Sequence, residues 1–133
     1  MSTIVYELPW YATGLRADKL AAALQELTPK LLELGALEVR VLRARDDQYR
    51  FRQSIVVPDK TTWARLWNSP TFVQFRATNT SFHQKPLNYE IYAPIAHASA
   101  EGLADVFGDE PFGPAKAAED DRVSGQPVPT QSG

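Results

Sequence analysis

The sequence predicts an α+β fold whose strands and helices follow the order β-α-β-β-α-β. Three observations lead to this order. A stripe of leucines at steps of three and four residues indicates an amphipathic helix near the N-terminus. Two β-rich segments on either side of Asp46, Asp47 and Gln48 indicate a hairpin. A tryptophan-bearing segment with two helix-start signals follows that hairpin.

The first strand leads into the first helix. Residues 3–11 alternate in character and include two β-branched residues, as strands do, and Pro9 indicates an edge or a bulge. The leucine stripe of the helix consists of Leu20, Leu24, Leu27, Leu31 and Leu34. Thr28 and Pro29 interrupt this stripe like a cap followed by a first helical residue, so we expect a kink or two abutting helices. Gly35 is expected to end the segment.

The hairpin sets the register of the predicted sheet. Residues 37–45 pair with residues 49–57 across a three-residue loop, which sorts the side chains into two faces. The apolar face, expected to lie under the helices, collects Tyr6, Leu8, Val39, Val41, Phe51, Gln53, Ile55, Tyr89 and Ile91. The mixed face collects Val5, Glu7, Glu38, Arg40, Leu42, Arg50, Arg52, Val56, Glu90 and Tyr92. The mixed face suits an interface between two sheets of a dimer; a single solvated face is the alternative.

A second helical segment is expected before the last strand, which spans residues 87–93. Asp59 can cap a helix that carries Trp63. Ser69 and Pro70 repeat the signal of a cap followed by proline, and a further turn or two begins there. The complete order is that of the split βαβ, or ferredoxin-like, arrangement with an antiparallel sheet.

Charge and composition divide the 133-residue chain near His97. Residues 1–97 carry 12 Lys and Arg against 9 Asp and Glu, whereas residues 98–133 carry 2 against 7. The second part is rich in Pro, Gly and Ser, which predicts a largely disordered acidic tail. Within that tail, one helical turn could form around Leu103, Val106 and Phe107. The chain has no cysteine and no run of about 18 apolar residues, so we expect a cytoplasmic protein.

Two segments carry a resemblance to a known family. These are PDKTTWARLWNSPTFVQFR at residues 58–76 and IVYELPWYATG at residues 4–14. Over residues 3–95 the chain resembles the dimeric α+β barrel superfamily, which includes antibiotic biosynthesis monooxygenase-like and NIPSNAP-like proteins. The resemblance implies a homodimer with back-to-back sheets and a pocket between each sheet and its helices. Members of this superfamily oxidise aromatic polyketides without a cofactor, degrade haem, or act on other small metabolites.

The resemblance does not extend to haem binding. Haem-degrading members have an asparagine on the first strand and a histidine on the second helix. At the corresponding places this chain has Tyr6 and Glu7, and Val73, Gln74 and Phe75. We therefore expect no cofactor and no metal.

Candidate site residues come from the apolar face and from the single histidine of the domain body. His83 could act as a general base, with a plain loop histidine as the alternative. Gln53 is a polar residue in an apolar row, so it could orient a ligand or bond to Tyr6 or Tyr89. We take His83, Gln53 and Tyr6 as the candidate catalytic residues. The candidate substrate pocket consists of Trp10, Trp63, Trp67, Phe75 and Tyr89. Simple core packing is the alternative role of these rings.

These features favour a small-molecule-binding protein, of the monooxygenase-like type, that acts on a flat aromatic metabolite without a cofactor. The alternative is a noncatalytic module that acts through its dimer and its acidic tail. The expected homodimer contact uses the sheet face that bears Glu7, Arg40, Arg50, Arg52 and Glu90. Nucleic acid is not an expected partner, because the positive excess is small and the tail is acidic.

Overall fold

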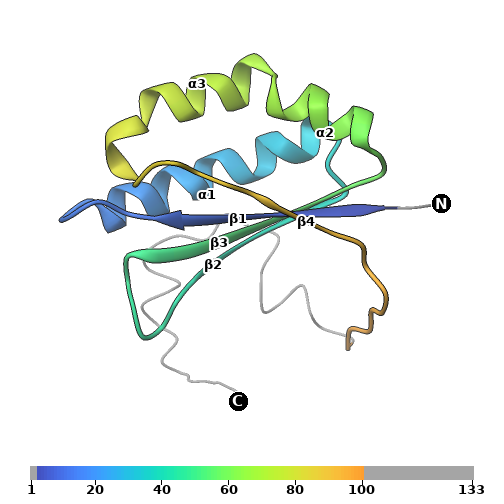
Figure 1. The fold of residues 1–133 in the computed structure, drawn as a ribbon, viewed down its shortest axis with the longest axis horizontal. Helices are drawn as coiled ribbons and strands as arrows, with labels where there is room; N and C mark the ends of the chain where they lie inside the picture. The colour runs from blue at the N-terminus through green and yellow to red at the C-terminus, as the bar shows by residue number, and fades with distance from the viewer. Residues whose placement is uncertain (1–2, 101–133) are drawn as a thin grey trace. The chain divides into compact units, whose positions relative to one another are not determined.

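The computed structural model of the protein describes residues 3–100 (Figure 1). The chain divides into two units, Met1–His97 and Ala98–Gly133, and all the elements below belong to the first. The helical turn expected around Leu103 and most of the expected acidic tail lie outside the described residues.

The predicted α+β fold and its element order are confirmed. The elements are β1 (Ile4–Tyr11), α1 (Ala17–Glu33), β2 (Glu38–Arg43), β3 (Arg50–Val57), α2 (Lys60–Trp67), α3 (Pro70–Thr78), the 3-10 helix η1 (Thr80–Phe82) and β4 (Glu90–Tyr92). The four strands form one antiparallel sheet in the order β2-β3-β1-β4. The three α-helices cover one face of this sheet (Figure 1). Among the described residues, no helix is long and apolar enough to cross a membrane.

The helix α1 differs from the expectation at its proline. A kink or two abutting helices were expected at Thr28 and Pro29, and the second alternative was wrong, because a single helix runs through both residues. The hydroxyl of Thr28 donates to the carbonyl of Leu24 at 2.8 Å, so Thr28 acts inside the helix and not as a new cap. Packing of the leucine face on the sheet outweighs the hydrogen bond that the proline cannot donate. Gly35 ends the segment as expected, with a φ of 118° that disfavours other residues.

The predicted hairpin register is confirmed. Arg43 lies opposite Phe51 and Glu38 lies opposite Val56, as a loop centred on Asp47 requires. The ladder stops before the expected loop, since β2 ends at Arg43 and β3 begins at Arg50. Along β3 the buried residues Phe51, Gln53, Ile55 and Val57 alternate with more exposed ones. One face of the sheet is therefore committed to the core.

The edges of the sheet explain two further observations. The strand β4 pairs with β1 only from Val5 to Glu7, so β1 has a free edge at Pro9. Ile91 lies opposite Tyr6 and belongs to the expected apolar face, yet it is 58% exposed. Its strand has only three residues at the sheet edge and is exposed throughout, so the expected burial of Ile91 was wrong.

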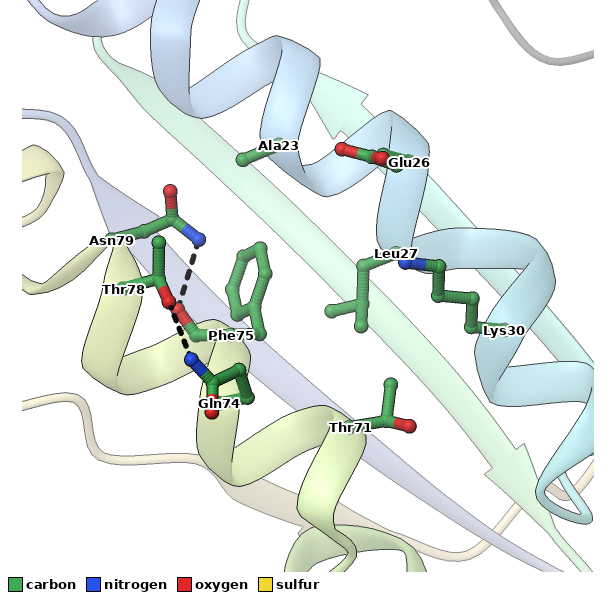
Figure 2. Close-up of a pocket in the computed structure, with 9 residues that line it drawn as sticks. All are labelled: Ala23, Glu26, Leu27, Lys30, Thr71, Gln74, Phe75, Thr78 and Asn79. Atoms are coloured by element: carbon green, nitrogen blue, oxygen red, sulfur yellow. Dashed lines mark hydrogen bonds between the residues drawn. The ribbon is translucent and has the colours of Figure 1, made fainter.

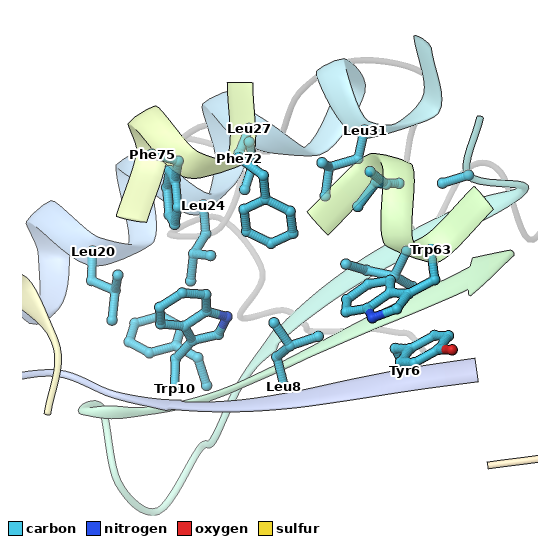
Figure 3. Close-up of a cluster of buried hydrophobic side chains, with 14 of the residues drawn as sticks. Tyr6, Leu8, Trp10, Leu20, Leu24, Leu27, Leu31, Trp63, Phe72 and Phe75 are labelled. Carbon is cyan, nitrogen blue, oxygen red and sulfur yellow. The ribbon is translucent and has the colours of Figure 1, made fainter. Parts of the chain in front are cut away.

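The second helical segment is capped as predicted. The side chain of Asp59 accepts from the Thr62 amide at 2.7 Å, and the Ser69 hydroxyl accepts from the Phe72 amide at 3.2 Å. These two caps split the segment into α2 and α3. Aromatic side chains of both helices point towards the sheet and pack there with the leucines of α1 (Figure 3).

Candidate functional site

The aromatic residues expected to line a pocket lie together between the sheet and the helices (Figure 3). They belong to one connected array, in which the centroids of neighbouring rings lie between 3.9 and 6.1 Å apart. The members of this aromatic array, in order of contact, are Tyr6, Trp63, Trp67, Phe72, Phe75 and Trp10. Tyr89 packs edge-on against Tyr6, Trp63 and Trp67.

The Tyr6 end of the array contains its closest ring contact. The rings of Tyr6 and Trp63 stack with centroids 3.9 Å apart and planes 6° from parallel. Tyr89 meets this stack from the side, with its centroid 5.6 Å from that of Tyr6 and 5.1 Å from that of Trp63. Burial, and next the neighbouring Tyr89, raise the pKa of the Tyr6 phenol. Tyr6 therefore remains a neutral phenol at pH 7, with one face of its ring covered by Trp63.

Gln53 lies on the central strand β3 and is completely buried. Its Oε1 accepts a hydrogen bond from the indole Nε1 of Trp10 at 3.0 Å. The partner is therefore Trp10, and neither of the expected tyrosines. The orientation of the amide is fixed, because Trp10 can only donate and only the oxygen of Gln53 can accept. The Nε2 group of Gln53 is left buried without a partner.

A second buried donor belongs to the same layer. The indole Nε1 of Trp63 is buried and has no hydrogen-bond partner. Figure 3 shows the indoles of Trp10 and Trp63 on either side of Leu8. Leu8 lies opposite Gln53 in the sheet, so the amide emerges from the same face, beside the Trp10 indole. Each unmatched donor costs about 1–3 kcal/mol of stability, so two of them in one small core need an explanation.

His83 lies at the opposite end of the array from Tyr6. It follows η1, pairs with Ala12 in an isolated bridge and is only 5% exposed. Its ring meets Trp10 edge-on, with centroids 4.7 Å apart, and its Nδ1 lies 3.1 Å from the carbonyl of Gln84. Burial lowers the pKa of His83 more than the bond to Gln84 raises it. With Nδ1 donating, the neutral ring keeps a lone pair on Nε2 and can accept a proton.

Arg76 is a site residue that sequence reasoning missed. It lies in the last turn of α3 with its guanidinium carbon 3.7 Å from the ring centroid of Trp67. Its Nη2 donates to the Trp67 carbonyl at 3.1 Å, while its Nη1 is buried without a partner. Burial also lowers the pKa of Arg76. The available signal was its helical spacing: Arg76 follows Phe72 by four residues, so both side chains share a face.

Two cavities lie elsewhere in the described part of the chain. A groove of about 210 Å³ separates α1 from α3 (Figure 2). It is lined by Ala23, Glu26, Leu27, Lys30, Thr71, Gln74, Phe75, Thr78 and Asn79. A cavity of about 450 Å³ lies on the outer face of the sheet, between residues such as Glu7 and Ser54 and the segment that ends at His97. Of the expected site residues, Phe75 lines the groove between α1 and α3, and the others line neither of these two cavities.

The acidic and basic groups of residues 3–100 form no metal site. No three His, Asp or Glu side chains gather there as a metal ion would require. Four polar groups in or beside the aromatic layer are relevant to ligand binding. These are the neutral His83 ring, the Gln53 amide, the Trp63 indole N–H and the Arg76 guanidinium. Together they supply one proton acceptor and three unmatched donors.

Comparison with known proteins identifies the fold. No family model matches this sequence, and no curated protein matches it. An antibiotic biosynthesis monooxygenase-like protein from Nitrosomonas europaea superposes with a TM-score of 0.66 at 15% sequence identity, covering 70% of this chain and 90% of that chain. The chain has the ferredoxin-like α+β fold of this structure.

Two further solved structures agree. Rv0793 from Mycobacterium tuberculosis has a TM-score of 0.65 at 15% identity, with 74% of this chain and 100% of that chain covered. PA3566 from Pseudomonas aeruginosa has a TM-score of 0.62 at 21% identity, with 74% and 97% covered. At such identities the likeness establishes the fold that the sequence predicted.

Proposed function

We propose that this protein binds a flat aromatic metabolite between its sheet and its helices, and that the metabolite carries an acceptor oxygen. The observation that supports this most strongly is the pair of buried donors, Gln53 Nε2 and Trp63 Nε1, which have no acceptor. Buried polar groups in folded proteins are almost always paired with protein, water or ligand. A carbonyl or hydroxyl oxygen on an aromatic ring would satisfy these donors while the ring stacks on its neighbours.

Access to this site requires movement of the segment between His83 and β4. In this segment Leu87 and Tyr89 pack partly buried against the core, while Gln84, Lys85 and Pro86 are exposed. The ribbon of this segment runs between α3 and β1 on its way to β4 (Figure 1). Displacing two partly buried side chains disturbs the fold less than moving a helix, since fewer apolar contacts are lost. We therefore assign the ligand entrance to residues 84–89.

The proposed reaction is a monooxygenation that needs no bound cofactor. His83 Nε2 takes a proton from the substrate, and the resulting anion is electron-rich enough to react with O2. A ring CH2 group becomes a carbonyl that holds one oxygen atom, while the second oxygen leaves as water with the two hydrogens. The substrate supplies all four electrons, so no other reductant is needed. Gln53, whose partner Trp10 also contacts His83, would bind the substrate oxygen, and Tyr6 would contact the far end of the ring system.

Calorimetric titration with naphthalene-2-carboxamide tests binding. This compound is flat and neutral, and its carbonyl oxygen is an acceptor. We expect binding to the unmodified protein and at least a tenfold weaker affinity for the Gln53→Leu variant, since one hydrogen bond is worth about 1.4 kcal/mol. Gln74→Leu makes the same chemical change at an exposed position of α3 and should leave the affinity unchanged. Equal affinity in all three proteins would contradict a site at Gln53.

We also propose that the protein is a homodimer joined through the outer face of its sheet. The support is the fold, together with Leu42 and Tyr92, which are 49% and 48% exposed on that face. The charged residues of the same face include Glu7, Arg40, Arg50, Arg52 and Glu90. The variant Leu42→Asp places a charged side chain where the dimer would bury an apolar one, so it should weaken the contact. Sedimentation should give a dimer for the natural protein and a monomer for this variant; a natural monomer would contradict the proposal.

The noncatalytic alternative is supported by the close packing of the aromatic array. If the rings of Trp63 and Phe75 only fill the core, they need no ligand, and their contact distances are those of ordinary aromatic pairs. In that case naphthalene-2-carboxamide would not bind, while the dimer would persist. Loss of a partner protein on deletion of residues 98–133 would then assign the function to the tail.

A further inference from the structure

We propose that Arg76 is an anion-binding residue, and that the metabolite bound beside the aromatic array carries a carboxylate on its ring. This inference rests on the proposed function and names the chemical class of its ligand. It starts from the position of the Arg76 guanidinium, which belongs to the wall of the same layer as the two unmatched donors.

The guanidinium is held against the array in a defined orientation. Its carbon lies 3.7 Å from the centroid of the Trp67 ring and 5.1 Å from that of Phe72. Trp67 in turn contacts Trp63, with ring centroids 5.4 Å apart. Stacking on Trp67 and the bond from Nη2 to the Trp67 carbonyl fix the plane of the guanidinium. The remaining terminal nitrogen, Nη1, is left buried and unmatched.

Other arginines of the domain have a carboxylate partner, which Arg76 lacks among the described residues. Arg43 and Arg50 bond to Asp18 and Asp46 at 2.9 and 2.8 Å, and these pairs are exposed to solvent. Arg76 has a buried nitrogen, and no described Asp or Glu pairs with it. Arg76 as a whole is partly buried, and this burial lowers its pKa. A ligand carboxylate at Nη1 would supply the missing counter-ion.

A purely structural role accounts for only part of this geometry. Trp67 is the last residue of α2, and a cation bonded to its carbonyl stabilises the C-terminal end of that helix. This role uses Nη2. It leaves Nη1 unexplained, and lysine would serve as well at that position. Arginine, with two terminal nitrogens, can hold the helix end with one and a carboxylate oxygen with the other.

An aromatic carboxylate matches the groups around Arg76 better than an isolated anion. Trp67 connects the guanidinium to Trp63, whose Nε1 is a second unmatched donor, and to the stack with Tyr6. Tyr6 and Trp67 cover the two faces of the Trp63 ring, so a flat ligand ring would pack against the edge of this stack, near the unmatched donors. Free phosphate or acetate would contact Arg76 and gain nothing from the neighbouring rings.

The test compares two ligands of one shape that differ in charge. Affinities of 2-naphthoate and naphthalene-2-carboxamide are measured by calorimetry at pH 7 for the natural protein, Arg76→Gln and Arg76→Lys. We expect 2-naphthoate to bind at least tenfold more tightly than the amide to the natural protein. In Arg76→Gln the two affinities should become equal. Arg76→Lys, which keeps the charge but not the fork, should retain part of the preference. Arg65→Gln removes an exposed arginine of α2 and should keep the full preference.

The outcomes separate this inference from the proposed function. If neither ligand binds the natural protein, the proposed function fails and the inference fails with it. If both bind with equal affinity, the proposed function stands and the anion site is refuted. A preference for 2-naphthoate that survives Arg76→Gln also refutes it. Melting temperatures of all variants show whether each is folded, and a purely structural Arg76 would lower the melting temperature without changing the ratio of the two affinities.

Discussion

Replacing Gln53 by leucine should remove ligand binding with little loss of stability. Two opposing changes follow from the structure. The indole N–H of Trp10, a residue 1% exposed, loses its acceptor 3.0 Å away, which costs about 1–3 kcal/mol. The buried and unmatched Nε2 disappears at the same time, which returns a penalty of similar size, about 1–3 kcal/mol. Leucine is close in volume to glutamine and fully apolar, so it fills the same space.

The net change in the free energy of unfolding is therefore expected to lie within about 1 kcal/mol of zero. Urea denaturation followed by tryptophan fluorescence measures it, and an unchanged m-value would show that both proteins unfold in the same way. A destabilisation of more than about 3 kcal/mol, with unchanged ligand affinity, would refute the reasoning, because it would make Gln53 a structural residue whose amide is fully used in the empty protein.

Three further predictions concern other features. Leu15 has a φ of 64° and is 93% exposed, so Leu15→Asn should raise the free energy of unfolding by about 1 kcal/mol in urea denaturation; a decrease would contradict the strain. Gly35→Ala should lower it by about 1–2 kcal/mol, because φ is 118° and the new Cβ would lie 3.1 Å from Thr62 Cγ2; equal stability would contradict this. Burial lowers the pKa of His83 below its ordinary value of 6.5, so the unfolded chain takes up a proton first as the pH falls. Stability should therefore drop below about pH 6.5, and this drop should be smaller in His83→Phe; NMR titration showing a pKa above 6.5 would contradict it.

Local signals predicted most of the fold. The loop around Asp47 sets the register of β2 and β3 because a short hairpin loop allows few pairings. Asp59 and Ser69 mark the starts of α2 and α3 because a capping side chain satisfies amides that the helix leaves free. Each of these signals depends on residues close together in the chain, so the sequence alone contains them.

Features that depend on distant contacts were harder to predict. The proline signal in α1 was correct as a local preference, but packing of the leucine stripe on the sheet outweighed it. The polar character of Gln53 in an apolar row was informative, whereas its partner, Trp10, lies 43 residues away. Arg76 was missed because its distinguishing feature is a buried Nη1 without a hydrogen-bond partner. Such a feature is visible only once the positions of all neighbouring atoms are known.

We have proposed that the two unmatched donors in the aromatic layer bind a ligand oxygen. Proton–nitrogen NMR spectra of the natural protein, recorded during titration with naphthalene-2-carboxamide, observe both donors directly. We predict that the Trp63 indole N–H and the Gln53 side-chain NH2 signals move downfield and saturate together, while the Trp10 indole N–H, already bonded to Gln53, moves less. Unchanged Trp63 and Gln53 signals at saturating ligand would contradict it.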